Sequence, residues 1–141
     1  MHQTAVVYWS GTGNTEAMAK AVADAAIAGG ASCSLFAAPE FQASMMDDYD
    51  AIAFGCPSMG AEELEEDEFA PMFEDCKAKL TGKRIALFGS YGWGDGEWMR
   101  SWSQTCRDAG AELCCEPVIC CGYPDEEALN ACEALGKTLA G

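Results

Sequence analysis

The chain has 141 residues, of which 50% are hydrophobic and 22% charged, a composition typical of a folded globular domain and not of a disordered segment. Eight Lys and Arg against 23 Asp and Glu give a formal net charge of -15, which argues against nucleic acid and anionic membranes as partners. The same acidity favours partners with basic patches, although it is also explained by solubility alone. We expect residues 1–141 to form a single domain.

The N-terminus shows no signal-peptide pattern, and no apolar run is long enough to span a bilayer. We therefore expect a cytoplasmic protein, in which the nine cysteines are mostly reduced thiols within the core. The cysteines form no C-x-x-C pair and the only histidine is His2, so no metal site is predicted.

Uninterrupted apolar runs predict three buried strands, at residues 3–9, 51–56 and 85–89. Two more mixed segments, at 32–37 and about 112–120, are typical of edge strands, and the second contains Pro117, which cannot donate to a sheet. Helical patterns separate and follow the strands at about 14–28, 68–80, 97–109 and 125–139.

This alternation predicts an α/β protein with a doubly wound, five-stranded parallel sheet and helices on both faces. With the three apolar strands at the centre, the right-handed crossover rule gives the strand order 2-1-3-4-5. The ligand cleft of such a sheet opens at the carboxyl ends of strands 1 and 3. Three unusual loops leave the carboxyl ends of the central strands, so we expect them to converge on one site.

The first loop has the features of a phosphate site. It lies between a strand and a helix, where unpaired backbone N–H groups and the helix dipole favour an anion. Its glycines allow a tight turn, and its hydroxyl and amide side chains add donors. No Lys or Arg precedes Lys20, so a phosphate here would meet neutral donors only. The residues concerned are Ser10, Gly11, Thr12, Gly13, Asn14 and Thr15.

Three well-known phosphate-binding or phosphorylated sites do not match these loops in residue identity. A Walker A loop needs a Lys that is absent, and Glu16 occupies the position of the third glycine in a dinucleotide fingerprint. A response-regulator receiver needs an aspartate at the end of strand 3, where this chain has Gly55 and Cys56.

Together, three segments make the chain resemble the flavodoxin family, in particular its short-chain type, over its whole length. They are residues 10–15, then Ser58, Met59, Gly60, Ala61 and Glu62, and finally Ser90, Tyr91, Gly92, Trp93, Gly94 and Asp95. Flavodoxins are themselves a standard example of this strand order with FMN at the switch point, so the placement of FMN is taken from the family. The resemblance implies a monomeric, low-potential carrier of single electrons with non-covalently bound FMN, cycling through quinone, semiquinone and hydroquinone states. It implies redox proteins as partners and no substrate of its own.

Within the resemblance, the second and third loops suit a clamp on the flavin ring. Trp93, flanked by glycines, would stack on the outer face, and Met59 would cover the inner face. Glu62 resembles the family residue that accepts a hydrogen bond from the flavin N3–H. The plainer alternatives are that Met59 and Trp93 are core residues and that Glu62 is one more solvated acid beside Glu63, Glu65 and Glu66. Trp9, Trp98 and Trp102 are expected to be core residues or to lie on helix faces.

One position departs from many relatives. In the family, the peptide after the glycine of the second loop flips on one-electron reduction, and Gly60 would make this flip easy. Ala61 follows, where relatives often carry Asp, Asn or Gly. A type II turn would place Ala61 at positive φ, at a cost of roughly 1–2 kcal/mol. We therefore expect Ala61 to weaken the half-reduced state.

Two functions follow from these residues. A carrier would dock through an acidic face at residues 62–68, with Asp95 as a further candidate, on basic patches of reductases and oxidoreductases. The alternative is an FMN-dependent NAD(P)H:quinone or small-molecule reductase, which needs an open pocket over the ring. Trp93 stacked there would obstruct it. Cys56, beside Pro57 in the second loop, is left without an assigned role.

Overall fold

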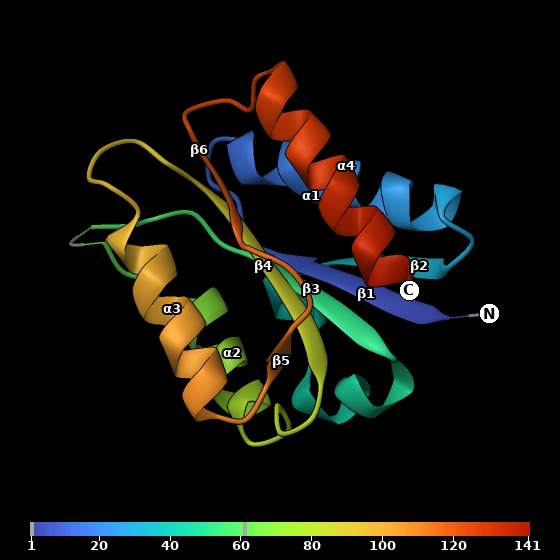
Figure 1. The fold of residues 1–141 in the computed structure, drawn as a ribbon. Coiled ribbons are helices and arrows are strands. Elements are labelled where there is room, and N and C mark those ends of the chain that lie inside the picture. Colours follow the sequence, from blue (N-terminus) through green and yellow to red (C-terminus); the bar gives the residue numbers. More distant parts are fainter. Residues whose placement is uncertain (1, 61) are drawn as a thin grey trace.

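A computed structural model describes residues 2–60 and 62–141, so the expectation for Ala61 lies outside the described residues. The elements alternate between strand and helix as the apolar pattern predicts (Figure 1). The strands are β1 (Gln3–Tyr8), β2 (Ser32–Ala37), β3 (Ala51–Gly55), β4 (Arg84–Tyr91), β5 (Glu112–Leu113) and β6 (Val118–Cys121). The helices are α1 (Asn14–Ala28), α2 (Phe69–Lys77), α3 (Glu97–Asp108) and α4 (Glu126–Ala140), with short 3₁₀ helices at Ala38–Glu40 and Ala43–Asp48.

The sheet is parallel in every pairing of these strands, in the order β2-β1-β3-β4-β5, with β6 also paired to β4. The predicted order 2-1-3-4-5 is confirmed, with β3 and β4 fully or almost fully buried at its centre. One detail of the sequence prediction is wrong: the last strand is not continuous over 112–120. It pairs with β4 at Glu112–Leu113 and again at Val118–Cys121. Pro117 lies in the break, where its missing N–H disturbs no ladder.

Helices cover the sheet in two pairs, α1 with α4 on one face and α2 with α3 on the other (Figure 1). Side chains of β3 alternate between the faces, so that Ile52 and Phe54 join the aromatic core under α2 and α3 while Ala51 and Ala53 face α1 and α4. On the face covered by α1 and α4, the two helices approach each other closely because α4 carries Gly136. A Cβ there would collide with the Val22 carbonyl oxygen of α1.

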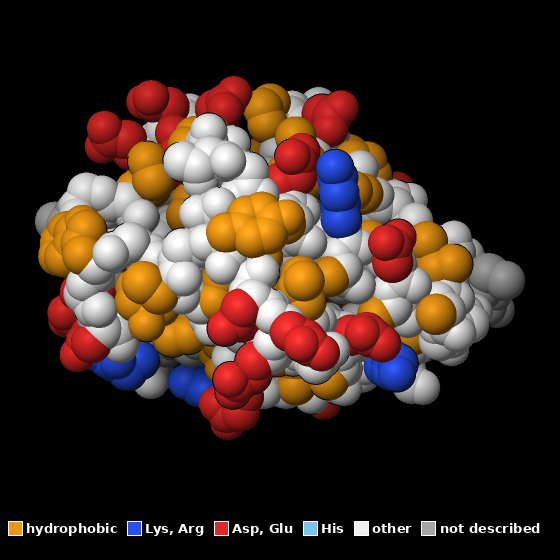
Figure 2. Space-filling model, turned by 90° about the horizontal axis from the view of Figure 1, so that it is seen from above, with side chains coloured by type: hydrophobic (Ala, Val, Ile, Leu, Met, Phe, Trp, Pro, Cys, Tyr) orange, Lys and Arg blue, Asp and Glu red, His pale blue; other side chains and the backbone are white. Residues whose placement is uncertain are grey.

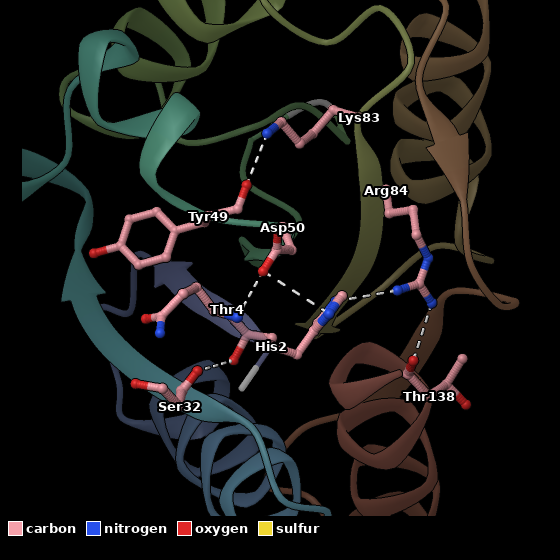
Figure 3. Close-up of polar contacts among 9 residues, drawn as sticks. His2, Thr4, Ser32, Tyr49, Asp50, Lys83, Arg84 and Thr138 are labelled. Atoms are coloured by element: carbon pink, nitrogen blue, oxygen red, sulfur yellow. Dashed lines mark hydrogen bonds and ion pairs between the residues drawn. The ribbon is translucent and has the colours of Figure 1, made fainter.

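The amino ends of the central strands are closed by polar contacts (Figure 3). Asp50 accepts from the Gln3 N–H at 2.8 Å, and its own N–H donates to the Gln3 carbonyl at 2.7 Å. Lys83 Nζ donates to the carbonyl of the residue before Asp50 at 2.8 Å, and Arg84 donates to the Thr138 carbonyl at the end of α4 at 3.1 Å. These contacts tie the amino ends of β1, β3 and β4 to one another and to the end of α4.

No helix among the described residues is long and apolar enough to cross a membrane. Within the same part of the chain, no three His, Cys, Asp or Glu side chains are grouped so as to hold a metal ion.

Candidate functional site

A cavity of about 240 Å³ opens at the carboxyl edge of the sheet, between the three predicted loops. Every residue that lines it is uncharged. Ten of the predicted site residues are among them: Ser10, Gly11, Thr12, Asn14, Thr15, Ser58, Met59, Ser90, Tyr91 and Gly92. Segments far apart in the sequence therefore meet in one place, as the strand order predicts.

The first loop turns directly into the start of α1. Gly13 lies just before the helix with φ 95°, a left-handed conformation that favours glycine, and its N–H donates to Ser10 Oγ at 3.0 Å. Gly11 lies against the ring of Trp9, where a Cβ would approach Cη2 to 2.9 Å. The loop thus presents the free N–H groups at the start of α1 to the cavity, together with neutral side-chain donors.

Ser90 ties the three loops together. Its N–H donates to Thr15 Oγ1 at 3.4 Å, its carbonyl accepts from the Ser58 N–H at 3.0 Å, and its hydroxyl donates to the Gly122 carbonyl. Thr15 and Ser90 are both buried. Ser90 therefore contributes its hydroxyl to the protein itself, and its place in the cavity wall fixes the relative positions of the loops.

The second loop closes on itself as a short antiparallel turn. Met59 and Glu63 exchange backbone hydrogen bonds of 2.8 and 2.9 Å, and between them Gly60 and Glu62 have φ of 52° and 56°. Glu62 is the one described residue other than glycine with positive φ, a conformation that costs a residue with a Cβ about 1 kcal/mol. Backbone strain of this kind gathers at ligand sites.

Six of the other predicted residues that the structure describes are absent from the cavity wall: Gly13, Gly60, Glu62, Trp93, Gly94 and Asp95. Glu62 Oε1 is buried without a hydrogen-bond partner among the described residues, and it lies so close to Gly94 that a Cβ there would collide with it. Trp93 is 63% exposed, and Asp95 is paired with Arg100 at 3.0 Å. The stacking of Trp93 on a ring stays a prediction, as does the part of Gly60, Gly94 and Asp95 in binding.

Three cavity residues were not predicted: Trp9, Pro57 and Gly122. Trp9 was expected to be a core residue or to lie on a helix face. It packs against the core but is only half-buried, and its Nε1–H donates to Glu68 Oε1 at 2.9 Å. Its position directly before the first loop was the available signal. Gly122 comes from the turn after β6, and its N–H donates to the Tyr91 carbonyl at 2.9 Å. The sequence feature that could have indicated Gly122 is a glycine directly after a strand that ends at the carboxyl edge of the sheet.

The acidic segment contains one residue that does not belong to a solvated face. Glu65 is buried and accepts from the N–H groups of Asp67, Glu68 and Phe69 at 2.7–2.8 Å. Its grouping with the solvated acids is thus wrong, because its carboxylate caps the start of α2. Burial works against ionisation, but the three backbone donors outweigh it and lower the pKa of Glu65.

Cys56 is fully buried on the side of the sheet that faces α2, and it is absent from the cavity wall. Burial raises the pKa of its thiol to about 12, and its Sγ accepts from the Glu65 N–H at 3.4 Å. The residue whose role the sequence leaves open is therefore an inert packing group. Trp98 and Trp102 are buried, as expected.

Comparisons with known proteins agree with this geometry. The family model described as flavodoxin matches residues 6–136. The chain is 44% identical over 140 residues to the flavodoxin of Megasphaera elsdenii, covering 96% of both chains. It is 42% identical over 135 residues to that of Clostridium beijerinckii, covering 96% of this chain and 97% of the relative. The solution structure of two-electron reduced Megasphaera elsdenii flavodoxin superposes with a TM-score of 0.90 at 43% identity, covering 97% of this chain and 98% of the other.

Proposed function

Because this chain belongs to the flavodoxin family, we propose that it is a low-potential carrier that passes single electrons between redox enzymes and turns over no substrate of its own. Flavodoxins are electron-transfer proteins that bind FMN, and this chain is an FMN-binding electron carrier. The low potential, the transfer of single electrons and the basic partners are proposed from one observation: every residue in the cavity wall is uncharged, and the carboxylates of Glu62 and Glu63 follow the wall residue Met59 in the second loop.

The residues present fit FMN. The start of α1 and the side chains of Ser10, Thr12 and Asn14 offer neutral donors for a phosphate group. The buried, unpartnered Oε1 of Glu62 is an acceptor without a donor, and such a group is costly until a donor is bound. A ring N–H is a donor of this kind. When bound, FMN supplies one-electron redox chemistry.

The second loop offers the freedom that a backbone switch needs. A Cβ at Gly60 would meet no atom within 4 Å, and Gly60 already lies in the left-handed region. In the family, the glycine at this position turns its carbonyl toward the cofactor after one electron has been added. We propose the same role for the Gly60 carbonyl, as an acceptor that favours the one-electron-reduced state.

The charge around the cavity makes further reduction harder. A carboxylate at roughly 10 Å in an effective dielectric of about 20 raises the cost of an added negative charge by about 1.7 kcal/mol, or roughly 70 mV for one electron before salt screening. Not every carboxylate of the acidic segment and the third loop opposes reduction at full strength, because some are paired with positive charge in the structure. Asp95 is offset by Arg100, and Glu65 by the start of α2. Glu62 and Glu63 are the acids of the second loop that keep their effect, and an unneutralised phosphate adds to it.

The acidic surface suits partners with basic docking patches. Seen from above, Asp and Glu side chains outnumber Lys and Arg and lie among exposed hydrophobic side chains (Figure 2). Such a surface accelerates association with a basic partner and makes the rate fall with salt. We expect the carrier to act as a monomer in the cytoplasm, where its cysteines stay reduced.

Anaerobic reduction followed by absorbance tests this proposal. A carrier passes through a distinct long-wavelength species at half reduction and does not oxidise NADH unless a reductase is added. Direct oxidation of NADH with a quinone acceptor, and no species at half reduction, would instead establish a reductase.

A further inference from the structure

We propose that Cys114 and Cys115 form a reversible dithiol site that exchanges with low-molecular-weight disulfides, with Cys114 as the attacking thiol and Cys115 as the resolving thiol. The two residues lie between β5 and β6, at an edge of the sheet (Figure 1). They are absent from the wall of the cofactor cavity. The inference therefore goes beyond the proposed function and does not depend on it.

The backbone brings both thiols to one face of the sheet. In a regular strand, consecutive side chains point to opposite faces. The two cysteines instead both pack against the core under α1 and α4, because the chain bends at Cys115. The bend follows from the register of the last strand. Leu113 pairs with Ile85 and Val118 with Phe88, so the last strand spends two more residues than β4 between these pairings.

A second pair of consecutive cysteines shows the difference that the bend makes. Cys120 and Cys121 lie within β6, where the pairing with β4 is regular. Cys120 packs against the core under α1 and α4, and its thiol donates to Met18 Sδ at 3.6 Å, whereas Cys121 is exposed. The thiols of this second pair point to opposite faces. Of the two pairs, the one at 114–115 is placed to act together.

Cys114 is the more reactive thiol of its pair. The neighbouring Cys115 thiol stabilises the Cys114 thiolate and Arg84 adds to this, so that the pKa of Cys114 is lowered although burial works against it. The pKa of Cys115 is raised, mainly by the same contact with Cys114. Both residues are partly exposed. A partly exposed thiolate beside a second thiol is the arrangement in which one sulfur attacks and the other resolves.

The exchange proceeds in two steps. The Cys114 thiolate bonds to one sulfur of a small disulfide, the S–S bond of that disulfide breaks, and one half leaves and takes up a proton. Cys115 then loses its proton and bonds to the Cys114 sulfur, and the other half leaves and takes up a proton. Two protein thiols are thereby oxidised, and one small disulfide is reduced to two thiols.

The bend permits this closure, and the spacing keeps it reversible. Neither the N–H nor the carbonyl of Cys115 forms a hydrogen bond with another described residue, so its peptide turns without loss of a ladder bond. Consecutive Cα atoms are about 3.8 Å apart, closer than the roughly 4.4–6.8 Å usual for a disulfide. The bond is therefore strained, and an excess of small thiols returns it to the dithiol.

Incubation of the FMN-loaded protein with glutathione disulfide at neutral pH, in the dark and without oxygen, tests the proposal. The reaction is stopped with acid, and the modified cysteines are located by mass spectrometry of fragmented peptides. The pair at 114–115 should lose the mass of two hydrogen atoms, whereas Cys121 should keep one bound glutathione because Cys120 faces away. Cys115→Ser should trap one glutathione on Cys114, and excess reduced glutathione should restore the starting masses.

Two matched variants separate the pair from general thiol reactivity. Cys114→Ser and Cys120→Ser each remove a partly exposed thiol that packs on the same face of the sheet. Cys114→Ser should slow modification of the 114–115 segment about fivefold or more, because the stabilised thiolate is gone. Cys120→Ser should change that rate by less than about twofold.

A lasting glutathione on Cys114 in the unchanged protein, equal closure of the two cysteine pairs, or equal rates in the two variants would overturn the proposal. The reduction spectrum of the same samples reports on the proposed function separately. A holoprotein that takes up single electrons but forms no disulfide between residues 114 and 115 would overturn only the dithiol site.

Discussion

Replacement of Glu65 by glutamine should destabilise the fold more than any other single carboxylate change in the acidic segment. The Glu65 carboxylate accepts three backbone N–H groups at the start of α2. Oε1 accepts from Glu68 and Phe69, and Oε2 accepts from Asp67. A glutamine can keep one oxygen in place but presents an NH₂ group to the other site, where two donors then face each other.

The magnitude follows from these contacts. Hydrogen bonds to a charged acceptor contribute about 1.5–3 kcal/mol each, and neutral ones about 1 kcal/mol. Glu65→Gln weakens two bonds and removes a third, so we expect a loss of about 2–4 kcal/mol in the free energy of unfolding at pH 7. The folded-state pKa of Glu65 is lowered, so this contribution is present above the ordinary carboxyl pKa of about 4.3. It disappears as the pH falls through the lowered value.

Urea unfolding of the apoprotein, followed by tryptophan fluorescence, measures the effect. Glu66→Gln is the control, because the neighbouring Glu66 is exposed and should change stability by less than about 0.5 kcal/mol. The gap between the wild type and Glu65→Gln should narrow below about pH 4. Equal midpoints for the two variants at pH 7, or a gap that widens in acid, would refute the role given to Glu65.

Three further changes have defined outcomes. Ala61→Gly should raise the first one-electron midpoint potential by about 40–80 mV, because the residue after Gly60 would no longer resist positive φ; an unchanged or lower midpoint would contradict this. Trp9→Phe removes the 2.9 Å bond to Glu68 and should weaken FMN binding by about threefold to tenfold in a fluorescence titration of the apoprotein, whereas Glu68→Gln, which keeps an acceptor, should have a smaller effect. Gly55→Ala would drive a Cβ into the Phe88 ring and should lower the free energy of unfolding by about 1–3 kcal/mol or more; a neutral effect in urea unfolding would show that the ring can move aside.

The fold followed from the sequence because its strongest signals are local. Apolar runs identify the central strands, and the crossover rule then leaves one order. The details that depend on pairing or packing across the sheet could not be predicted from the sequence. Pro117 was correctly assigned to an edge, but whether it ends a strand or interrupts it depends on the partner strand β4. Gly55 looks like a loop glycine until the Phe88 ring is seen to lie against it.

The sequence predicted which loops meet at the cavity, because that depends on where the strands end. It did not predict where the side chains of those loops point. The loops meet as expected because their strands end at one edge. The carboxylates of residues 62–68 look alike in sequence, yet Glu65 turns inward to α2, Glu68 binds Trp9, and Glu62 Oε1 lies against Gly94. Those directions depend on the path of the chain between β3 and α2, which no periodic pattern records.

Spectroelectrochemical titration of the FMN-loaded protein is the sharpest test of the proposed carrier function. We expect two separated one-electron waves, with the second well below the midpoint potential of free FMN, because the cavity itself is uncharged and Glu62 and Glu63 lie in the loop that forms part of its wall. The second wave should move upward with added salt as the carboxylates are screened. A single two-electron wave near the potential of free FMN, unmoved by salt, would contradict a low-potential carrier of single electrons.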